Sequence, residues 1–82
     1  MNRLESLVSK VEEIPVDNEI EILKAYKEIL SIQPDHPDGL VAAGAYMDVY
    51  SEEYIDVYRN AVAFNPLNAE LHYELGYLLS RE

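Results

Sequence analysis

The decapeptides AYKEILSIQP, residues 25–34, and VYRNAVAFNP, residues 57–66, lie 32 residues apart and match position by position. Tyrosine stands opposite tyrosine, proline opposite proline, lysine opposite arginine and glutamine opposite asparagine. The register continues into the following segment, where Gly44 stands opposite Gly76 and Ala43 opposite Leu75. A repeat of this length that ends in proline predicts helical hairpins which stack and share one core. Such arrays usually work by presenting a surface, so the repeat indicates a binding protein.

Apolar residues recur at helical spacing along the chain and predict an all-α fold of about five antiparallel helices. Asn18 followed by Glu21 reads as a capping box for the second helix, and Ser51 and Asn68 are the expected N-caps of the last two. The helices are expected over residues 2–13, 18–33, 38–50, 52–64 and 69–81.

The third predicted helix contains two glycines. Asp35 or His36 is its expected N-cap, with Pro37 in the first turn, where a missing N–H is tolerated. Gly39 and Gly44 each lower helix propensity by roughly 1 kcal/mol relative to alanine. Glycine at such positions predicts the close approach of a neighbouring helix.

Composition narrows the class of protein. Eighty-two residues make one domain, and the absence of cysteine excludes a disulfide scaffold and a thiolate metal site. The net charge of −10 argues against nucleic acid and anionic membranes, and favours a basic partner unless the acidity only keeps the chain in solution. No apolar run approaches the roughly 20 residues of a membrane span, and the N-terminus lacks the apolar region of a signal peptide. A cytoplasmic location is therefore expected.

The repeated segments resemble the tetratricopeptide repeat, a helix pair with a Leu-Gly step on its first helix and a proline after its second. The resemblance covers about residues 18–82 and implies a short right-handed solenoid of two and a half repeats. The residues that carry it are Leu40, Ala43, Gly44, Met47, Tyr58, Ala61, Pro66, Leu75 and Gly76, together with Tyr26, Ile29 and Pro34 one repeat earlier.

Several features depart from the family pattern. The period is 32 residues rather than about 34. Tyr54 stands where a small residue is usual, the first predicted helix lacks the Leu-Gly step, and the last predicted helix is of the first type rather than a clear polar capping helix. We therefore expect one domain, 1–82, with a degenerate first repeat at 1–36, a second repeat at 37–68 and a partial third repeat at 69–82.

In the tetratricopeptide family the first helices of successive pairs line a concave groove. A groove that clamps a carboxylate would need lysine, arginine and asparagine, so a basic or amphipathic segment of another protein is the expected partner. Glu70, Tyr73, Glu74 and Tyr77 also share one helical stripe by spacing alone. The resemblance places on the concave face Asp38, Val41, Ala42, Ala45, Asp48, Val49, Glu70, Tyr73, Glu74, Tyr77 and Arg81.

Tyrosines and the last leucines leave alternatives open. Tyr73 and Tyr77 either contact a partner or pack on a neighbouring helix, whereas Tyr26, Tyr54 and Tyr58 fall on core positions. Leu75, Leu78 and Leu79 either fold onto the preceding helices or dock a second copy in a two-fold dimer.

Residues that could carry chemistry are sparse. His36 and His72 stand alone and are expected to be a turn residue and a packing residue, with no metal site. Glu52, Glu53 and Asp56 form an acidic edge that is expected to be solvated, because acid–base catalysis needs a desolvated site. No phosphate-binding, dinucleotide-binding or calcium-binding motif is present. The sequence therefore predicts neither an enzyme nor a cofactor.

Three functions fit these observations. The first is a non-catalytic interaction module, an adaptor that binds a basic or amphipathic segment of a partner protein. The second is a small acidic inhibitor of the immunity or antitoxin type, which neutralises a basic toxin or enzyme. The third is a structural subunit that assembles with itself.

Overall fold

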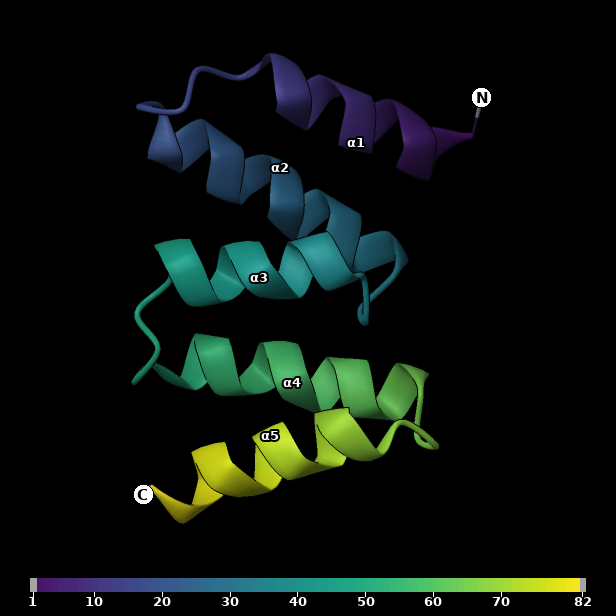
Figure 1. Ribbon diagram of the computed structural model, residues 1–82, viewed down its shortest axis with the longest axis vertical. Helices are drawn as coiled ribbons and strands as arrows, with labels where there is room; N and C mark the ends of the chain where they lie inside the picture. Colours follow the sequence, from purple (N-terminus) through teal and green to yellow (C-terminus); the bar gives the residue numbers. More distant parts are fainter. Residues whose placement is uncertain (1, 82) are drawn as a thin grey trace.

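The computed structural model describes residues 2–81, and these form five α-helices joined by short turns (Figure 1). No strand occurs within these residues, so the predicted all-α class is confirmed. None of the helices described is both long and apolar enough to cross a membrane. The helices are α1 (Arg3–Glu13), α2 (Glu19–Ile32), α3 (Pro37–Tyr46), α4 (Glu52–Phe64) and α5 (Ala69–Ser80).

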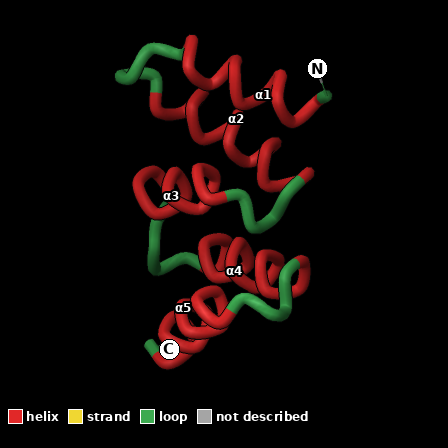
Figure 2. Tube along the Cα trace, turned by 45° about the vertical axis from the view of Figure 1, so that its right-hand side comes forward, coloured by secondary structure: helices red, strands yellow, loops and turns green. Residues whose placement is uncertain are grey.

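The helices lie side by side in chain order, each antiparallel to the one before it, and the two ends of the chain lie at opposite ends of the row (Figures 1 and 2). The chain measures 36 × 27 × 15 Å, so the row is little thicker than one helix. The main contacts join α1 to α2, α2 to α3 and α4 to α5, and the α3–α4 contact is sparser. The right-handed solenoid stays a prediction.

The repeat is visible in the turns that follow α2 and α4. The His36 N–H donates to the Gln33 carbonyl at 3.0 Å, and the Asn68 N–H donates to the Asn65 carbonyl at 3.2 Å, so the same bond recurs 32 residues later. The two turns also touch, because the Asn65 side-chain amide donates to the Asp35 carboxylate at 3.1 Å. This bond ties the start of α3 to the end of α4.

Four N-caps were expected, and two of them form the side-chain hydrogen bond of a cap, whereas His36 holds the N-cap position of α3 without one. The Ser51 hydroxyl accepts from the Tyr54 N–H at 3.2 Å, and the Asn68 side chain accepts from the Leu71 N–H at 3.3 Å. Both caps are confirmed. The predicted capping box at Asn18 is wrong, because the Asn18 side chain makes no capping hydrogen bond and its backbone is not in the extended conformation that a cap requires.

The third helix is shorter than predicted. The chain leaves the helix at Met47, which has an extended backbone. The Asp48 carboxylate accepts from the Tyr50 N–H at 2.9 Å, and its carbonyl accepts from the Ser51 N–H at 3.0 Å. An aspartate that bonds to the backbone two residues on competes with the helix. Asp48 and Val49 therefore lie in the α3–α4 turn, and their predicted place on a helical face is wrong.

The core divides unevenly along the row. The rings of Tyr54 and Tyr58 meet edge to face, with centroids 5.5 Å apart, so the predicted core role of these two tyrosines is confirmed. Val11, Ile22, Ile29 and Ala42 are buried outside the largest cluster. That cluster spans α3, α4 and α5 and consists of Ala43, Tyr54, Ile55, Tyr58, Ala61, Leu71 and Leu78.

Glycine allows a close helix contact at one position. A Cβ on Gly39 would lie 2.7 Å from Leu30 Cδ2, closer than carbon atoms approach, so a larger residue there would force the Leu30 side chain to move. A Cβ on Gly44 would make an ordinary 3.4 Å contact with the Tyr54 hydroxyl, and one on Gly76 would meet nothing within 4 Å. The predicted close approach is confirmed at Gly39 alone.

Candidate functional site

A groove of about 370 Å³ opens between α1 and α3, with α2 side chains contributing to its wall. Four residues that the sequence places on the concave face line it, and they come from one side of α3. Tyr46 at the end of α3 also lines it, and the rest of the lining comes from α1, from the α1–α2 turn and from α2. The α1–α3 groove is lined by Val11, Glu12, Ile14, Val16, Ile22, Tyr26, Asp38, Val41, Ala42, Ala45 and Tyr46.

The groove exists because α3 carries small side chains on the face that it turns toward α1. Ala42 and Ala45 line the groove, and neither is large enough to fill the space between the helices. One repeat later, the equivalent positions on α5 hold Glu74 and Tyr77. Val41 also lines the groove but is 73% exposed, so it lies at the edge. The result is an apolar surface open to a partner.

The electrostatics of the groove favour a cation. Burial raises the pKa of the Tyr26 phenol, and repulsion from the Asp38 carboxylate, the Tyr46 phenol and the Glu12 carboxylate raises it further. The Asp38 and Glu12 charges therefore act on the same hydroxyl from α3 and α1. Among the residues that line the groove within 2–81 there is no lysine or arginine.

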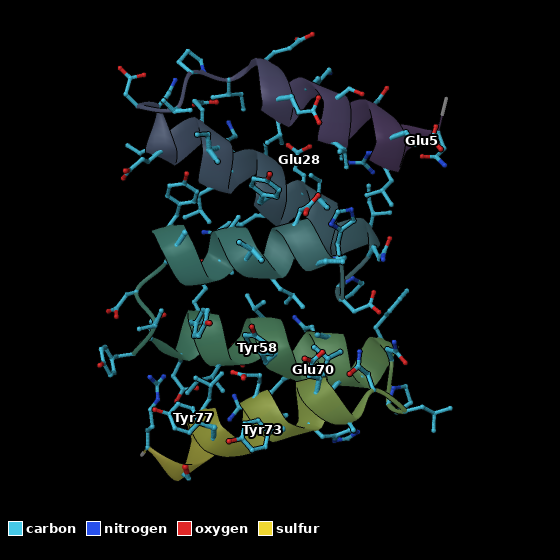
Figure 3. The ribbon with its side chains drawn as sticks, viewed as in Figure 1. Glu5, Glu28, Tyr58, Glu70, Tyr73 and Tyr77 are labelled. Atoms are coloured by element: carbon cyan, nitrogen blue, oxygen red, sulfur yellow. The ribbon has the colours of Figure 1, made fainter. Side chains whose placement is uncertain are left out.

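A second part of the predicted face lies on α5. Figure 3 shows Tyr73 and Tyr77 projecting from this helix one turn apart. Tyr73 is 74% exposed and Tyr77 is 55% exposed, and Glu70 is exposed beside them. Glu74 differs, because it is half-buried and acts on the buried Tyr58 phenol. The exposed α5 stripe therefore consists of Glu70, Tyr73 and Tyr77.

The three leucines proposed for self-association divide into buried and exposed. Leu78 is 4% exposed within the chain, and Leu75 packs against the same core cluster. Leu79 alone stays open, at 41%. Of the two alternatives, Leu78 and Leu75 follow the one in which the side chains fold onto the preceding helices.

A smaller cleft between α2 and α4 was not predicted. It has a volume of about 290 Å³, and the Lys27 ammonium bridges it to the Glu53 carboxylate at 2.6 Å. The repeat predicts that the hairpins stack, but it does not show which side chains of α2 and α4 leave a cleft between them. Its lining residues are Lys27, Leu30, Ser31, Pro34, Met47, Glu53, Asp56, Val57 and Asn60.

The two histidines have local structural roles. His36 is the N-cap residue of α3, in keeping with the predicted turn. His72 is exposed and lies 2.6 Å from the Pro66 carbonyl through Nε2, so its predicted packing role is wrong. No group of three or more histidine, aspartate or glutamate side chains within residues 2–81 is arranged to hold a metal ion.

Comparison of the chain with protein-family models, with curated proteins and with solved structures finds no match. The resemblance to the tetratricopeptide repeat therefore rests on the residues named above. The α1–α3 groove and the α5 stripe are the surfaces of the described residues that bear on function.

Proposed function

We propose that this protein is a non-catalytic interaction module whose α1–α3 groove binds a basic or amphipathic segment of a partner protein. The observation that carries the proposal is the composition of the groove: apolar walls, two carboxylates and no basic side chain among the residues that line it. Its volume of about 370 Å³ falls in the range of roughly 300–1,000 Å³ that is usual for ligand pockets.

The charge of the whole chain supports this choice of partner. The chain has sixteen acidic and six basic residues. A net negative field attracts a positively charged partner and raises the rate at which the two molecules meet. Lys27 pairs with Glu53, and Arg59 pairs with Asp56 at 2.8 Å. These basic side chains are already engaged within the chain, so the groove carboxylates have no competing cation from them.

The α5 stripe supplies a second contact region for the same partner. Tyr73 and Tyr77 offer large, rigid and amphipathic contact area at a low cost in side-chain entropy. Glu70 adds a negative charge beside them. A partner that is long enough to leave the groove would meet these side chains next.

The proposal is tested by titrating the protein with an 18-residue helical peptide built from leucine and lysine, followed by calorimetry. Glu12→Gln with Asp38→Asn removes both groove charges and should weaken binding about fivefold, as expected for two partly solvated ion pairs. The matched control is Glu5→Gln with Asp17→Asn, two exposed carboxylates outside the groove, which should change the Kd less than twofold.

Blocking the groove gives a larger effect. Val41→Lys places a long cation at the edge of the groove and should weaken binding at least tenfold. Ile20→Lys is its control, because Ile20 is 81% exposed and lies outside the groove. Equal losses from both substitutions, or no binding to the wild-type protein, would overturn the assignment. Loss only on Glu70→Lys with Tyr73→Ala would move the site to α5.

The acidic inhibitor is the second candidate, favoured by the net charge of −10. It predicts a single basic partner protein and an association rate that falls steeply with salt. An association rate that is insensitive to salt would remove this candidate.

A further inference from the structure

Arg81 lies against two aromatic rings at the end of α5. Its guanidinium carbon is 4.8 Å from the centroid of the Tyr50 ring and 5.7 Å from that of Tyr77. Both distances fall inside the roughly 6 Å at which a cation is attracted to a ring face. The Nη2 group also donates to the Val49 carbonyl oxygen. Within residues 2–81 no carboxylate lies at ion-pair distance from this side chain.

The site is open to solvent although it is filled. Tyr50 is 80% exposed and Tyr77 is 55% exposed, so the two rings stand at the surface with an arginine against them. The Arg81 Nε atom is buried and has no hydrogen-bond partner. The two rings and one hydrogen bond from Nη2 thus hold the guanidinium, while its Nε–H donor has no acceptor. A side chain held in this way is replaceable by a better-placed one.

We propose that the Tyr50 ring, the Tyr77 ring and the Val49 carbonyl form a guanidinium-binding site, which Arg81 fills in the free protein and an arginine of the partner fills in the complex. The inference rests on the proposed function, because it specifies one side chain of the basic segment that the module binds. Arginine is preferred over lysine since a planar guanidinium stacks on aromatic rings and keeps N–H groups free for the carbonyl.

The position of the site agrees with this role. Tyr77 belongs to the α5 stripe, so the guanidinium-binding site continues the surface that Glu70 and Tyr73 begin. Tyr50 and Val49 come from the α3–α4 turn, which Arg81 therefore joins to α5. An incoming arginine would take over this link, and α5 would stay fixed to the turn.

The site is tested with the tripeptide acetyl-Gly-Arg-Gly-amide, titrated while the Tyr50 and Tyr77 ring resonances are followed by NMR. Arg81→Ala removes the internal competitor, which acts at a high effective concentration, so the variant should bind the tripeptide about fivefold more tightly than the wild type. Tyr50→Ala added to Arg81→Ala should abolish the gain. Arg59→Ala is the matched control, because it removes an exposed arginine outside the site and should leave the Kd unchanged.

The outcomes separate the inference from the proposed function. An Arg81→Ala variant that stays folded by circular dichroism and binds no better than the wild type would overturn the site. Equal affinity for acetyl-Gly-Lys-Gly-amide would overturn the choice of arginine. If the leucine–lysine peptide binds in the groove while the arginine tripeptide shifts neither ring, the inference fails and the proposed function stands. If the tripeptide binds but the leucine–lysine peptide does not bind in the groove, the proposed function fails and the guanidinium-binding site stands.

Discussion

Tyr26 and Tyr58 hold the same position in the repeat, yet their surroundings differ. Tyr58 is 9% exposed and joins Tyr54, Leu71 and Leu78 in the main buried cluster. Tyr26 is half-buried and lines the α1–α3 groove, so its predicted core role holds only in part. The second repeat therefore uses this tyrosine for stability, whereas the first repeat uses it to build an open surface.

The helices around the two tyrosines show the same contrast. Tyr54, Ile55, Tyr58 and Ala61 are buried on α4, whereas Val11 is the one buried residue of α1. Most buried apolar side chains of the described residues thus belong to α3, α4 and α5, and the groove lies where fewer side chains are buried. The comparison teaches that the α1–α3 groove and the main buried cluster lie toward opposite ends of the row.

The largest expected effect on this contrast comes from truncating one apolar side chain to alanine in each half. Ile55 is 3% exposed in the main cluster, and Ile55→Ala should lower the free energy of unfolding by about 3 kcal/mol. Leu7 is half-buried on α1, and Leu7→Ala should cost about 1 kcal/mol. Urea unfolding followed by circular dichroism measures both. Equal losses would show that α1 packs as firmly as α4 and would break the contrast.

At alkaline pH, Tyr58 and Tyr26 should contribute differently to the free energy of unfolding. Burial, with a hydrogen bond to Tyr54 and repulsion from Tyr54 and Glu74, raises the pKa of Tyr58 well above its ordinary value. Because the pKa of this phenol is higher in the folded state than in the unfolded state, its contribution to the free energy of unfolding is fully present below about pH 10. The contribution is lost as the pH rises further, because the unfolded chain ionises first. The loss is at most about 1.4 kcal/mol per pH unit for one group.

Tyr58→Phe and Tyr26→Phe provide the measurement. Each substitution removes an ionisable phenol. Between roughly pH 9 and pH 11 the unfolding free energy of the variant should therefore fall less than that of the wild type. The pKa of Tyr26 is also raised, by burial and then by Asp38. A smaller effect from Tyr26→Phe is expected because this ring is less buried. An equal or larger effect would place Tyr26 in the core.

Two glycine substitutions test how closely the helices approach in each half. Gly39→Ala should lower the unfolding free energy by about 1 kcal/mol, since its Cβ would lie 2.7 Å from Leu30 and the overlap outweighs the gain in helix propensity. Gly76→Ala should raise it by about 0.5–1 kcal/mol, because its Cβ would meet nothing within 4 Å. Thermal melts of both variants would decide, and a stabilising Gly39→Ala would contradict the close α2–α3 contact.

The smallest effect concerns the ion pair that joins the two halves. Lys27 and Glu53 link α2 to α4 at 2.6 Å, but their side chains are 50% and 60% exposed. A double-mutant cycle with Lys27→Ala and Glu53→Ala should give a coupling of about 0.5 kcal/mol or less, reduced further by salt. A coupling energy that does not decrease in high salt would contradict the expectation that solvent and salt screen this exposed ion pair.

Local patterns predicted most of the fold. Helical periodicity found all five helices of residues 2–81, and α4 has the bounds that were expected. Ser51 and Asn68 were found as caps because a cap depends on a hydrogen bond three residues away. The end of α3 was missed because the Asp48 side chain competes with the helix, an effect that apolar periodicity does not contain.

The candidate site was predicted only in part. Asp38, Val41 and Ala45, which the sequence puts on one face of the third helix, line the groove. Glu12 and the rest of the α1 wall were missed, because the first helix matches the repeat poorly and its place depends on contacts between helices. The site of Arg81 was missed for the same reason, since it needs the α3–α4 turn to meet the end of α5.

The order of the helices in the row has a kinetic consequence. The main contacts join helices that follow one another in the sequence, so the chain closes only short loops as it folds. Proteins dominated by such local contacts fold in roughly microseconds to milliseconds. An 82-residue row of this kind should therefore fold near the fast end for its size, with little time in which an incomplete row exposes apolar surface.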